Sequence, residues 1–229
     1  MTTLILASLL LGQSGLKIED QKVGKGPAAK AGDVMTMSYR GTLLNGKVFD
    51  ETGKKAPFTF KLGAGQVIKG WDQGMVGIKV GGKRKLTIPA SLAYGDRDLG
   101  EIPANSTLVF VVEALRIDDP DAKPAVDIKD LKVGSGPAAG AKSSVTLHYR
   151  GTFINGVEFD KSYGREPFSL TLGQGSVIPG FEQGIMGMKK GGKRKVTIPY
   201  QLAYGENGRP PVIPRMASLV FELELLSIK

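Results

Sequence analysis

The 229-residue sequence contains no cysteine, so it has no disulfide framework, no thiol redox centre and no thiolate ligand for zinc. It has a single histidine, His148, which cannot build a zinc cage without cysteine. The same scarcity leaves no Ser-His-Asp or Cys-His set for nucleophilic catalysis. His148 stands in an alternating stretch beside Tyr149, and we expect a structural role for it. We expect no metal and no cofactor.

Long basic tracts are missing as well. The formal net charge is +9, yet the excess of Lys and Arg is divided evenly between the two halves of the chain. The largest basic cluster is Lys-Arg-Lys, at 83–85 and again at 193–195. Such a cluster without exposed aromatic neighbours is typical of a solvated strand end, and we expect no nucleic-acid partner.

No apolar run is long enough to span a bilayer, and we expect no transmembrane segment. The apolar stretch 2–11, within a predicted leader or tail at 1–15, resembles the core of a secretory signal. No Lys or Arg precedes it and no Ala-x-Ala site follows it, so an extra strand or a disordered tail are alternatives. We favour export, to a periplasm or outside the cell, over a cytoplasmic location.

Two stretches nearly match a phosphate-binding loop. They are Gly77 to Arg84 and Gly187 to Arg194, and both carry Gly-x-x-x-x-Gly-Lys. Both have Arg where a Ser or Thr should hold magnesium, and both lead into a predicted strand rather than a helix. We therefore expect no nucleotide site there.

The chain is an internal repeat. Between residues 39–95 and 149–205 the offset is a constant 110, with 32 identities in 57 positions. Phe110 then corresponds to Phe221, so the second copy has one extra residue in the loop that follows Tyr204. We predict two domains, at 16–118 and 126–229, joined by a short proline-containing linker at 119–125.

Each copy is rich in strand patterns and holds one short helical stretch. In the first copy, alternation predicts strands at 16–20, 34–42, 47–50, 57–62, 83–88 and 107–117, the last being the best central strand. Asn45-Gly46 predicts a tight hairpin, 23–27 a turn and 68–75 a short helix between glycines. The fold class that follows is α+β, with an antiparallel sheet wrapped over a helix in each copy.

At this level of detail the residues resemble a known family, the FKBP-type peptidyl-prolyl cis/trans isomerases. The resemblance rests on Tyr39-Arg40-Gly41-Thr42, Asn45-Gly46, Phe49-Asp50, Pro57-Phe58, Val67-Ile68-x-Gly70-Trp71, Leu92-Ala93-Tyr94-Gly95 and Ile102-Pro103, and on the same series in the second copy. It covers nearly everything from Leu16 to Lys229. It implies a five- or six-stranded antiparallel sheet around a short helix, with an apolar pocket between them.

The resemblance also implies which residues line that pocket. In the first copy they are Tyr39, Phe49, Asp50, Phe58, Val67, Ile68, Trp71, Tyr94, Ile102 and Phe110. In the second they are Tyr149, Phe159, Asp160, Phe168, Val177, Ile178, Phe181, Tyr204, Val212, Ile213 and Phe221. The alternative, that these side chains are only core, would have to hold for both matching sets.

A physical argument agrees with the implied activity. The bond before proline isomerises slowly because it has partial double-bond character, and the twisted transition state is less polar than the planar amide. A dry aromatic pocket should therefore favour the twisted form without any covalent step. We expect Trp71 or Phe181 as the floor, and Asp50 or Asp160 to orient neighbours rather than act as a base. The N–H of Ile68 or Ile178 and the hydroxyl of Tyr94 or Tyr204 are expected donors.

The expected partners are proline-containing unfolded or loop segments of proteins, with macrolides of the tacrolimus and rapamycin class as inhibitors and a monomer as the working form. A non-catalytic peptide-binding protein or chaperone is the alternative. The copies should differ, because Glu101 replaces the apolar Val212, Phe181 replaces Trp71, and Arg209 stands where a loop would meet the substrate backbone. We predict that the second copy is the more efficient site.

Overall fold

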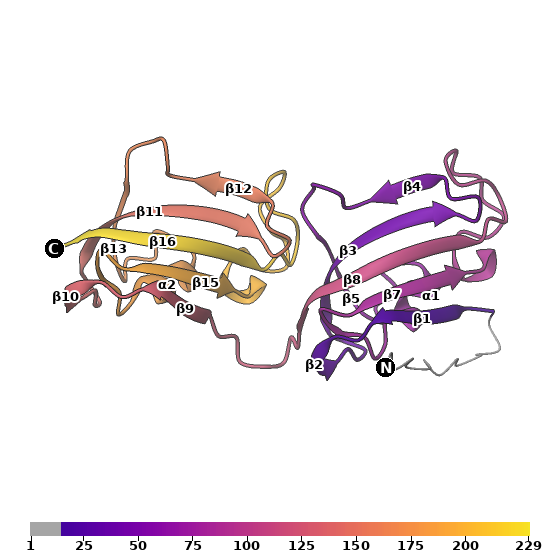
Figure 1. Cartoon of the computed structure of the whole chain (residues 1–229), viewed down its shortest axis with the longest axis horizontal. Helices are drawn as coiled ribbons and strands as arrows, with labels where there is room; N and C mark the ends of the chain where they lie inside the picture. Colours follow the sequence, from indigo (N-terminus) through magenta and orange to yellow (C-terminus); the bar gives the residue numbers. More distant parts are fainter. Residues whose placement is uncertain (1–14) are drawn as a thin grey trace, which may run out of the picture. The chain divides into compact units, whose positions relative to one another are not determined.

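The computed structural model describes residues 15–229, which form two compact units that divide after Asp121 (Figure 1). The predictions made for residues 1–14, a signal, a strand or a tail, lie outside the described residues. No helix among the described residues is long and apolar enough to cross a membrane. Each unit is described below by itself.

The two units contain the same elements in the same order. Unit 1 has β1 (Lys17–Lys22), β2 (Lys25–Ala28), β3 (Val34–Leu43), β4 (Val48–Glu51), β5 (Phe58–Lys61), α1 (Lys69–Gly74), β6 (Lys79–Val80), β7 (Lys83–Ile88), the 3₁₀ turn η1 (Ala90–Leu92) and β8 (Leu108–Asp118). Unit 2 has β9 (Asp127–Lys132), β10 (Ser135–Ala138), β11 (Ser144–Phe153), β12 (Glu158–Lys161), β13 (Phe168–Thr171), α2 (Pro179–Ile185), β14 (Lys189–Lys190), β15 (Lys193–Ile198), η2 (Tyr200–Leu202) and β16 (Leu219–Ile228).

Each unit is built on a six-stranded antiparallel sheet. In unit 1 the strand order is β1-β7-β8-β3-β4. β4 pairs with the C-terminal part of β3, and β5 pairs with its N-terminal part, residues 34–37. In unit 2 the order β9-β15-β16-β11-β12, with β13 on β11, repeats it. The predicted α+β fold, two copies of an antiparallel sheet around a short helix, is therefore confirmed. The strand predicted as most central, now β8, does lie between β7 and β3.

Alternation along β8 explains why it is central. Its buried positions include Leu108, Phe110, Val112 and Ala114, every second residue, so one face of the strand lies in the core. The predicted Asn45-Gly46 hairpin joins β3 to β4. Gly46 takes a φ of +87°, which its lack of a Cβ permits.

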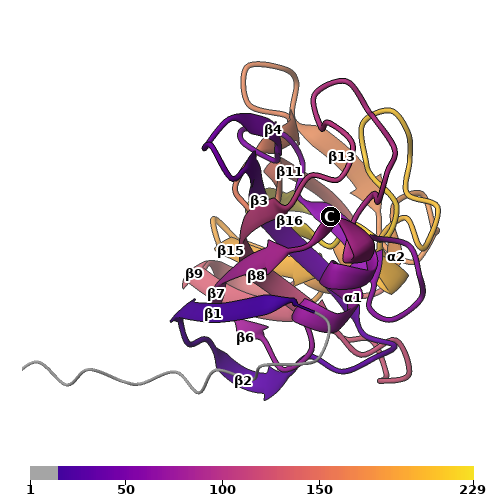
Figure 2. The ribbon, with the colours of Figure 1, turned by 90° about the vertical axis from the view of Figure 1, so that its right-hand side faces the viewer.

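The short helix packs on the sheet through glycines. Gly70 and Gly74 lie four residues apart, so they share one face of α1, and that face meets β7. Figure 2 shows α1 beside the sheet of unit 1. A Cβ on Gly70 would come within 2.3 Å of Ile88, and one on Gly74 within 2.8 Å of Leu86. Gly180 and Gly184 repeat the arrangement on β15. Trp71 follows Gly70 in α1, and Phe181 follows Gly180 in α2. Both aromatic side chains are buried.

The prediction of a turn at 23–27 was wrong. Residues 25–28 form β2, which pairs with the two-residue strand β6. The pairing depends on Gly24, because a Cβ there would lie 2.3 Å from the carbonyl oxygen of Val80. The local glycine content favours a turn at 23–27. Residues 25–28 nevertheless form a strand, because they pair with β6, which is more than 50 residues away in the sequence.

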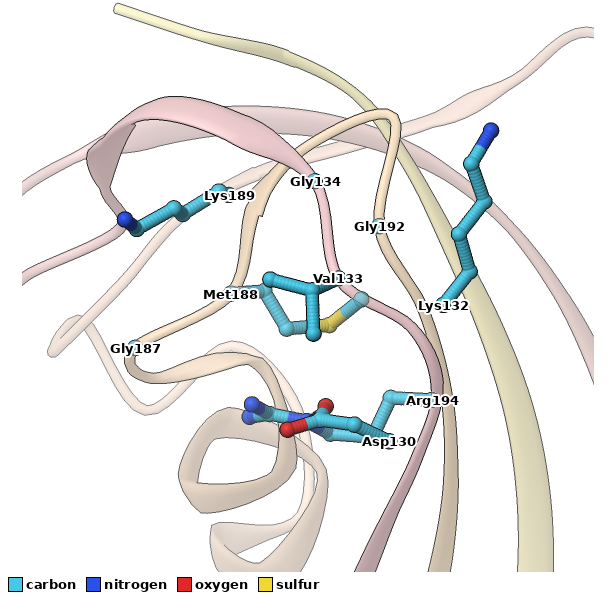
Figure 3. Close-up of a pocket in the computed structure, with 9 residues that line it drawn as sticks. All are labelled: Asp130, Lys132, Val133, Gly134, Gly187, Met188, Lys189, Gly192 and Arg194. Carbon is cyan, nitrogen blue, oxygen red and sulfur yellow. Dashed lines mark hydrogen bonds and ion pairs between the residues drawn. The ribbon is translucent and has the colours of Figure 1, made fainter.

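Arg84 and Arg194 stand where a phosphate-binding loop would have Ser or Thr, and both are buried. In unit 2 the Arg194 guanidinium donates to the carbonyls of Gly184 and Met186, both at 2.9 Å, at the end of α2. Its Nε lies 2.6 Å from an Asp130 carboxylate oxygen, and Figure 3 shows the two side chains together beside a small cavity under Val133 and Met188. That cavity has a volume of about 50 Å³, enough for a few water molecules and far smaller than an organic ligand needs.

Candidate functional site

Unit 2 contains a cavity of about 250 Å³ between α2 and the sheet. Phe181 of α2 lies at its base and is only 4% exposed. The cavity is lined by Tyr149, Phe159, Asp160, Phe168, Ser176, Val177, Ile178, Phe181, Tyr204, Arg209 and Phe221. Nine of the eleven residues predicted for the second pocket are among them.

The aromatic rings stand edge-on around Phe181. The Phe221 ring centroid is 5.0 Å from that of Phe181 with an interplanar angle of 82°, and Tyr149 is 5.9 Å away at 88°. Phe159 in turn stands at 87° to Phe221. Edge-to-face contacts of this kind favour one arrangement of the rings and so stabilise the walls of the cavity.

Polar groups stand on one side of the cavity. The Tyr149 hydroxyl donates to Asp160 Oδ2 at 2.5 Å, and Arg165 Nη2 lies 2.6 Å from Asp160 Oδ1. Burial, then the hydrogen bond to Asp160, raises the pKa of Tyr149 to about 12. Burial acts to raise the pKa of Asp160, but hydrogen bonds from Tyr149 and Arg165 outweigh it and hold that pKa below its usual value. Asp160 is therefore a charged acceptor that orients the tyrosine.

Two further residues that line the cavity carry the predicted donors. The backbone N–H of Ile178 precedes α2 and makes no hydrogen bond among the described residues, because the first turn of the helix offers it no acceptor. Tyr204, which follows η2, also lines the cavity. Both predicted donors thus belong to residues that line the same cavity.

The other two predicted residues, Val212 and Ile213, lie in the loop and line an adjoining cavity of about 460 Å³. This second cavity shares Phe159, Asp160, Tyr204 and Arg209 with the first. Ile213 is buried at 3% exposure, whereas Val212 is 54% exposed. The loop therefore buries its isoleucine, whereas its valine lines the adjoining cavity from the exposed side.

Unit 1 brings its predicted residues together around Trp71. Trp71, Ile102 and Phe110 are buried in the core, and Tyr39, Phe49, Val67, Ile68 and Tyr94 are half-buried against it. Phe58 is 37% exposed, although its ring lies 5.9 Å from Trp71. The exposed Asp50 accepts from the Tyr39 hydroxyl at 2.5 Å. Burial and that hydrogen bond raise the pKa of Tyr39 strongly.

The exchange of Trp71 for Phe181 has a polar consequence. The indole Nε1 of Trp71 is buried and has no hydrogen-bond partner among the described residues. An unpaired buried donor costs about 1–3 kcal/mol, and phenylalanine has no such donor. The core beside it changes too, because Phe60 packs on Trp71 at 5.7 Å and unit 2 has Leu170 at that position.

The loop of unit 1 differs from that of unit 2 in charge. Glu101 is exposed and its Oε2 lies 2.7 Å from Lys47 Nζ. We expected Glu101 to weaken an apolar wall, yet its counterpart Val212 is itself exposed and Ile102 below is buried. The substitution therefore adds a charged pair to the rim and leaves the isoleucine in place.

Sequence reasoning left two lining residues out of the second pocket. Ser176 directly precedes the predicted Val177, and only the cavity shows that it faces the same space. Arg209 was predicted to meet a substrate backbone but not to line the pocket, and it borders both cavities. An arginine in a glycine- and proline-containing loop gives no periodic signal that would place it.

His148 lies apart from this site. Its Nδ1 is 3.0 Å from Ser162 Oγ, and its ring stacks on Tyr163 at 4.8 Å. It does not line either cavity of unit 2. The structural role expected for it agrees with these contacts.

Comparison with known proteins identifies one family. The family model for the FKBP-type peptidyl-prolyl cis-trans isomerase matches residues 26–115 and again 136–226. Human peptidyl-prolyl cis-trans isomerase FKBP10 is 41% identical over 200 residues, which are 85% of this chain and 34% of that protein. FK506-binding protein 4 of Aspergillus fumigatus is 60% identical over 103 residues, 45% of this chain and 21% of its own length.

Among solved structures, the crystal structure of AtFKBP13 is 43% identical and covers 47% of this chain and 97% of its own, with a TM-score of 0.44. This chain spans about a third of the length of the FKBP10 relatives that it matches.

Proposed function

Because the chain belongs to the FKBP-type peptidyl-prolyl cis-trans isomerase family, we propose that it catalyses cis/trans isomerisation of X-Pro bonds in other proteins. Its substrates are proline-containing unfolded or loop segments. Macrolides of the tacrolimus and rapamycin class compete for the same pocket; the name of the Aspergillus relative records FK506 binding for that protein. The working form that we propose is a monomer, because each unit brings its own set of predicted pocket residues together.

The observation that carries this proposal is the composition of the cavity in unit 2. Its base and walls are aromatic, its carboxylate is already paired, and its lining offers no nucleophile activated by a base. A planar X-Pro amide carries charge separation that the twisted transition state has lost. An aromatic enclosure with the Ile178 N–H and Tyr204 hydroxyl at its edge therefore binds the twisted form better than the planar one.

The first test is a refolding reaction limited by proline isomerisation. We expect the full chain to accelerate it and tacrolimus or rapamycin to abolish the acceleration. Tyr204→Phe combined with Phe221→Ala should lower kcat/KM by about tenfold or more, because it removes one donor and one wall, whereas a surface change such as Lys195→Gln should not. Equal losses of catalysis and stability in the double variant would mean that these side chains serve only the core.

The reaction should be nearly independent of pH between about pH 5 and pH 9. Asp160 has a lowered pKa and stays charged throughout this range, and Tyr149 stays protonated until the pH approaches about 12. The stability that the Tyr149 hydrogen bond contributes is complete below the ordinary pKa of tyrosine and is lost as the pH rises through the raised pKa of Tyr149. The stability that charged Asp160 contributes is lost only as the pH falls through its lowered pKa. Measuring kcat/KM against pH checks this. A rate that rises with a midpoint inside the range would indicate general base catalysis instead.

We further propose that unit 2 is the more efficient site. Its loop is one residue longer, and its floor carries no unpaired indole N–H.

The alternative function is a non-catalytic peptide-binding protein or chaperone in which one or both pockets only hold apolar peptide. Binding of proline peptides and suppression of aggregation without faster isomerisation would favour that alternative.

A further inference from the structure

Arg209 occupies the junction of the two cavities in unit 2. It lines both of them, and its guanidinium lies 6.0 Å above the centroid of the Tyr204 ring. Its backbone is held by two hydrogen bonds with Ile213, at 2.8 and 2.9 Å. The loop therefore presents this side chain at the mouth of the pocket while its isoleucine closes the wall beneath.

The charge of Arg209 is not neutralised within the site. Asp160, the carboxylate that lines both cavities, is already paired with Arg165 and accepts from Tyr149. The Arg209 guanidinium takes part in no ion pair and no side-chain hydrogen bond among the described residues, and it lies over the Tyr204 ring. The side chain is exposed, so a ligand can reach it.

Unit 1 provides a contrast at the same place. Arg97 also lies over a tyrosine, 5.7 Å from the Tyr94 centroid, but it comes from a different position in a shorter loop. Its Nε donates to the Tyr94 carbonyl at 3.3 Å, so it is tied to its own loop. That loop also carries Asp96, Asp98 and Glu101, whereas the loop of unit 2 from Glu206 to Arg215 carries one acid and two arginines.

We propose that Arg209 is a specificity-determining residue, which makes unit 2 prefer proline segments with a carboxylate side chain next to the proline. This inference rests on the proposed function, because it names the substrate class of the same pocket. Phe181, Tyr204 and Arg209 line one cavity, and the Arg209 guanidinium lies 6.0 Å above the Tyr204 ring, so a peptide with its proline over Phe181 and its backbone at Tyr204 would bring a neighbouring side chain toward that guanidinium. An exposed charge pair of this kind corresponds to a preference of about two- to fivefold.

The test uses the full chain and two pairs of proline peptides, with Glu or Gln directly before the proline in one pair and directly after it in the other. Both kcat/KM and the dissociation constant are measured for each peptide. In at least one pair, the wild type should favour the Glu peptide about two- to fivefold, and the preference should shrink as salt is raised. Arg209→Gln should bring the ratio close to one, and Arg209→Lys should retain most of it.

Two matched variants separate Arg209 from general charge. Lys195→Gln removes one exposed positive charge from the sheet of unit 2 away from the cavities and should leave the ratio unchanged. Arg97→Gln makes the same change over the tyrosine of unit 1. If Arg97→Gln or Lys195→Gln removed the preference and Arg209→Gln did not, the assignment to Arg209 would be overturned.

The two proposals fail in different ways. If both peptides are isomerised equally well, or if the preference persists in Arg209→Gln, the inference is wrong and the proposed function stands. If neither peptide is isomerised but the Glu peptide binds more tightly in a manner that Arg209→Gln removes, the catalytic proposal falls and the role of Arg209 is retained.

Discussion

Replacing Arg84 with methionine is expected to lower the free energy of unfolding of unit 1 by about 2–4 kcal/mol. The Arg84 side chain is 7% exposed and donates to the carbonyls of Gly74 and Val76, at 2.7 and 2.9 Å, where α1 ends. Methionine fills much of the volume but donates nothing, so both carbonyls lose their buried partner. The partner carboxylate, Asp20, is 35% exposed and can be solvated by water, which limits its share of the cost.

The single tryptophan makes this effect measurable in one unit of the full chain. Trp71 belongs to unit 1, and unit 2 has Phe181 at the corresponding position. Unfolding followed by tryptophan fluorescence therefore reports on unit 1, while circular dichroism reports on both units. Arg84→Met should shift the fluorescence transition, and the matched change Arg194→Met should shift the other transition and leave the fluorescence one in place.

Lys83→Met is the control, because Lys83 is an exposed neighbour on the same strand. Its effect should stay within about 0.5 kcal/mol. A loss for Arg84→Met no larger than that of Lys83→Met would show that water replaces the guanidinium at the end of the helix without cost.

The second large effect is expected from Gly41→Ala, which should weaken binding of a proline peptide or macrolide to unit 1 by about tenfold or more. A Cβ at Gly41 would lie 2.6 Å from the Phe49 ring and 2.8 Å from the Phe110 ring. Overpacking of this kind costs about 1–3 kcal/mol and moves the rings, and both rings belong to the predicted pocket of unit 1. The pocket should therefore lose its shape before the unit loses its fold.

Ligand-induced changes in Trp71 fluorescence give the affinity of unit 1 alone. Gly41→Ala should reduce it, and Gly151→Ala, the same change against Phe159 and Phe221 in unit 2, should not. Gly140→Ala is the control, because a Cβ there meets no atom within 4 Å and the residue has no left-handed φ. Unchanged affinity in Gly41→Ala would contradict the idea that the rings are held by the missing Cβ.

Most of the fold was predictable because its signals are local. Alternation placed β3, β7 and β8 to within a few residues, Asn45-Gly46 placed the hairpin, and the constant offset of 110 revealed the second copy. The pocket residues followed from a resemblance carried by many motifs in order, and in unit 2 nine of the eleven line one cavity. Their roles in catalysis remain predictions that the experiments above address.

What the sequence by itself determined is thus the α+β repeat, the family, and the absence of cysteine and paired histidine, since all of these are properties of composition or of order along the chain. Tertiary structure alone decided what isolated residues do. In the folded chain Arg84 pairs with Asp20, 64 positions away. Gly70 and Gly74, four residues apart, allow α1 to pack closely on β7. Tertiary structure also placed Arg209 beside the Tyr204 ring at the pocket, where no carboxylate among residues 15–229 forms an ion pair with it. The physical reason is that burial and pairing depend on distances between segments far apart in the chain, and no local pattern encodes those distances.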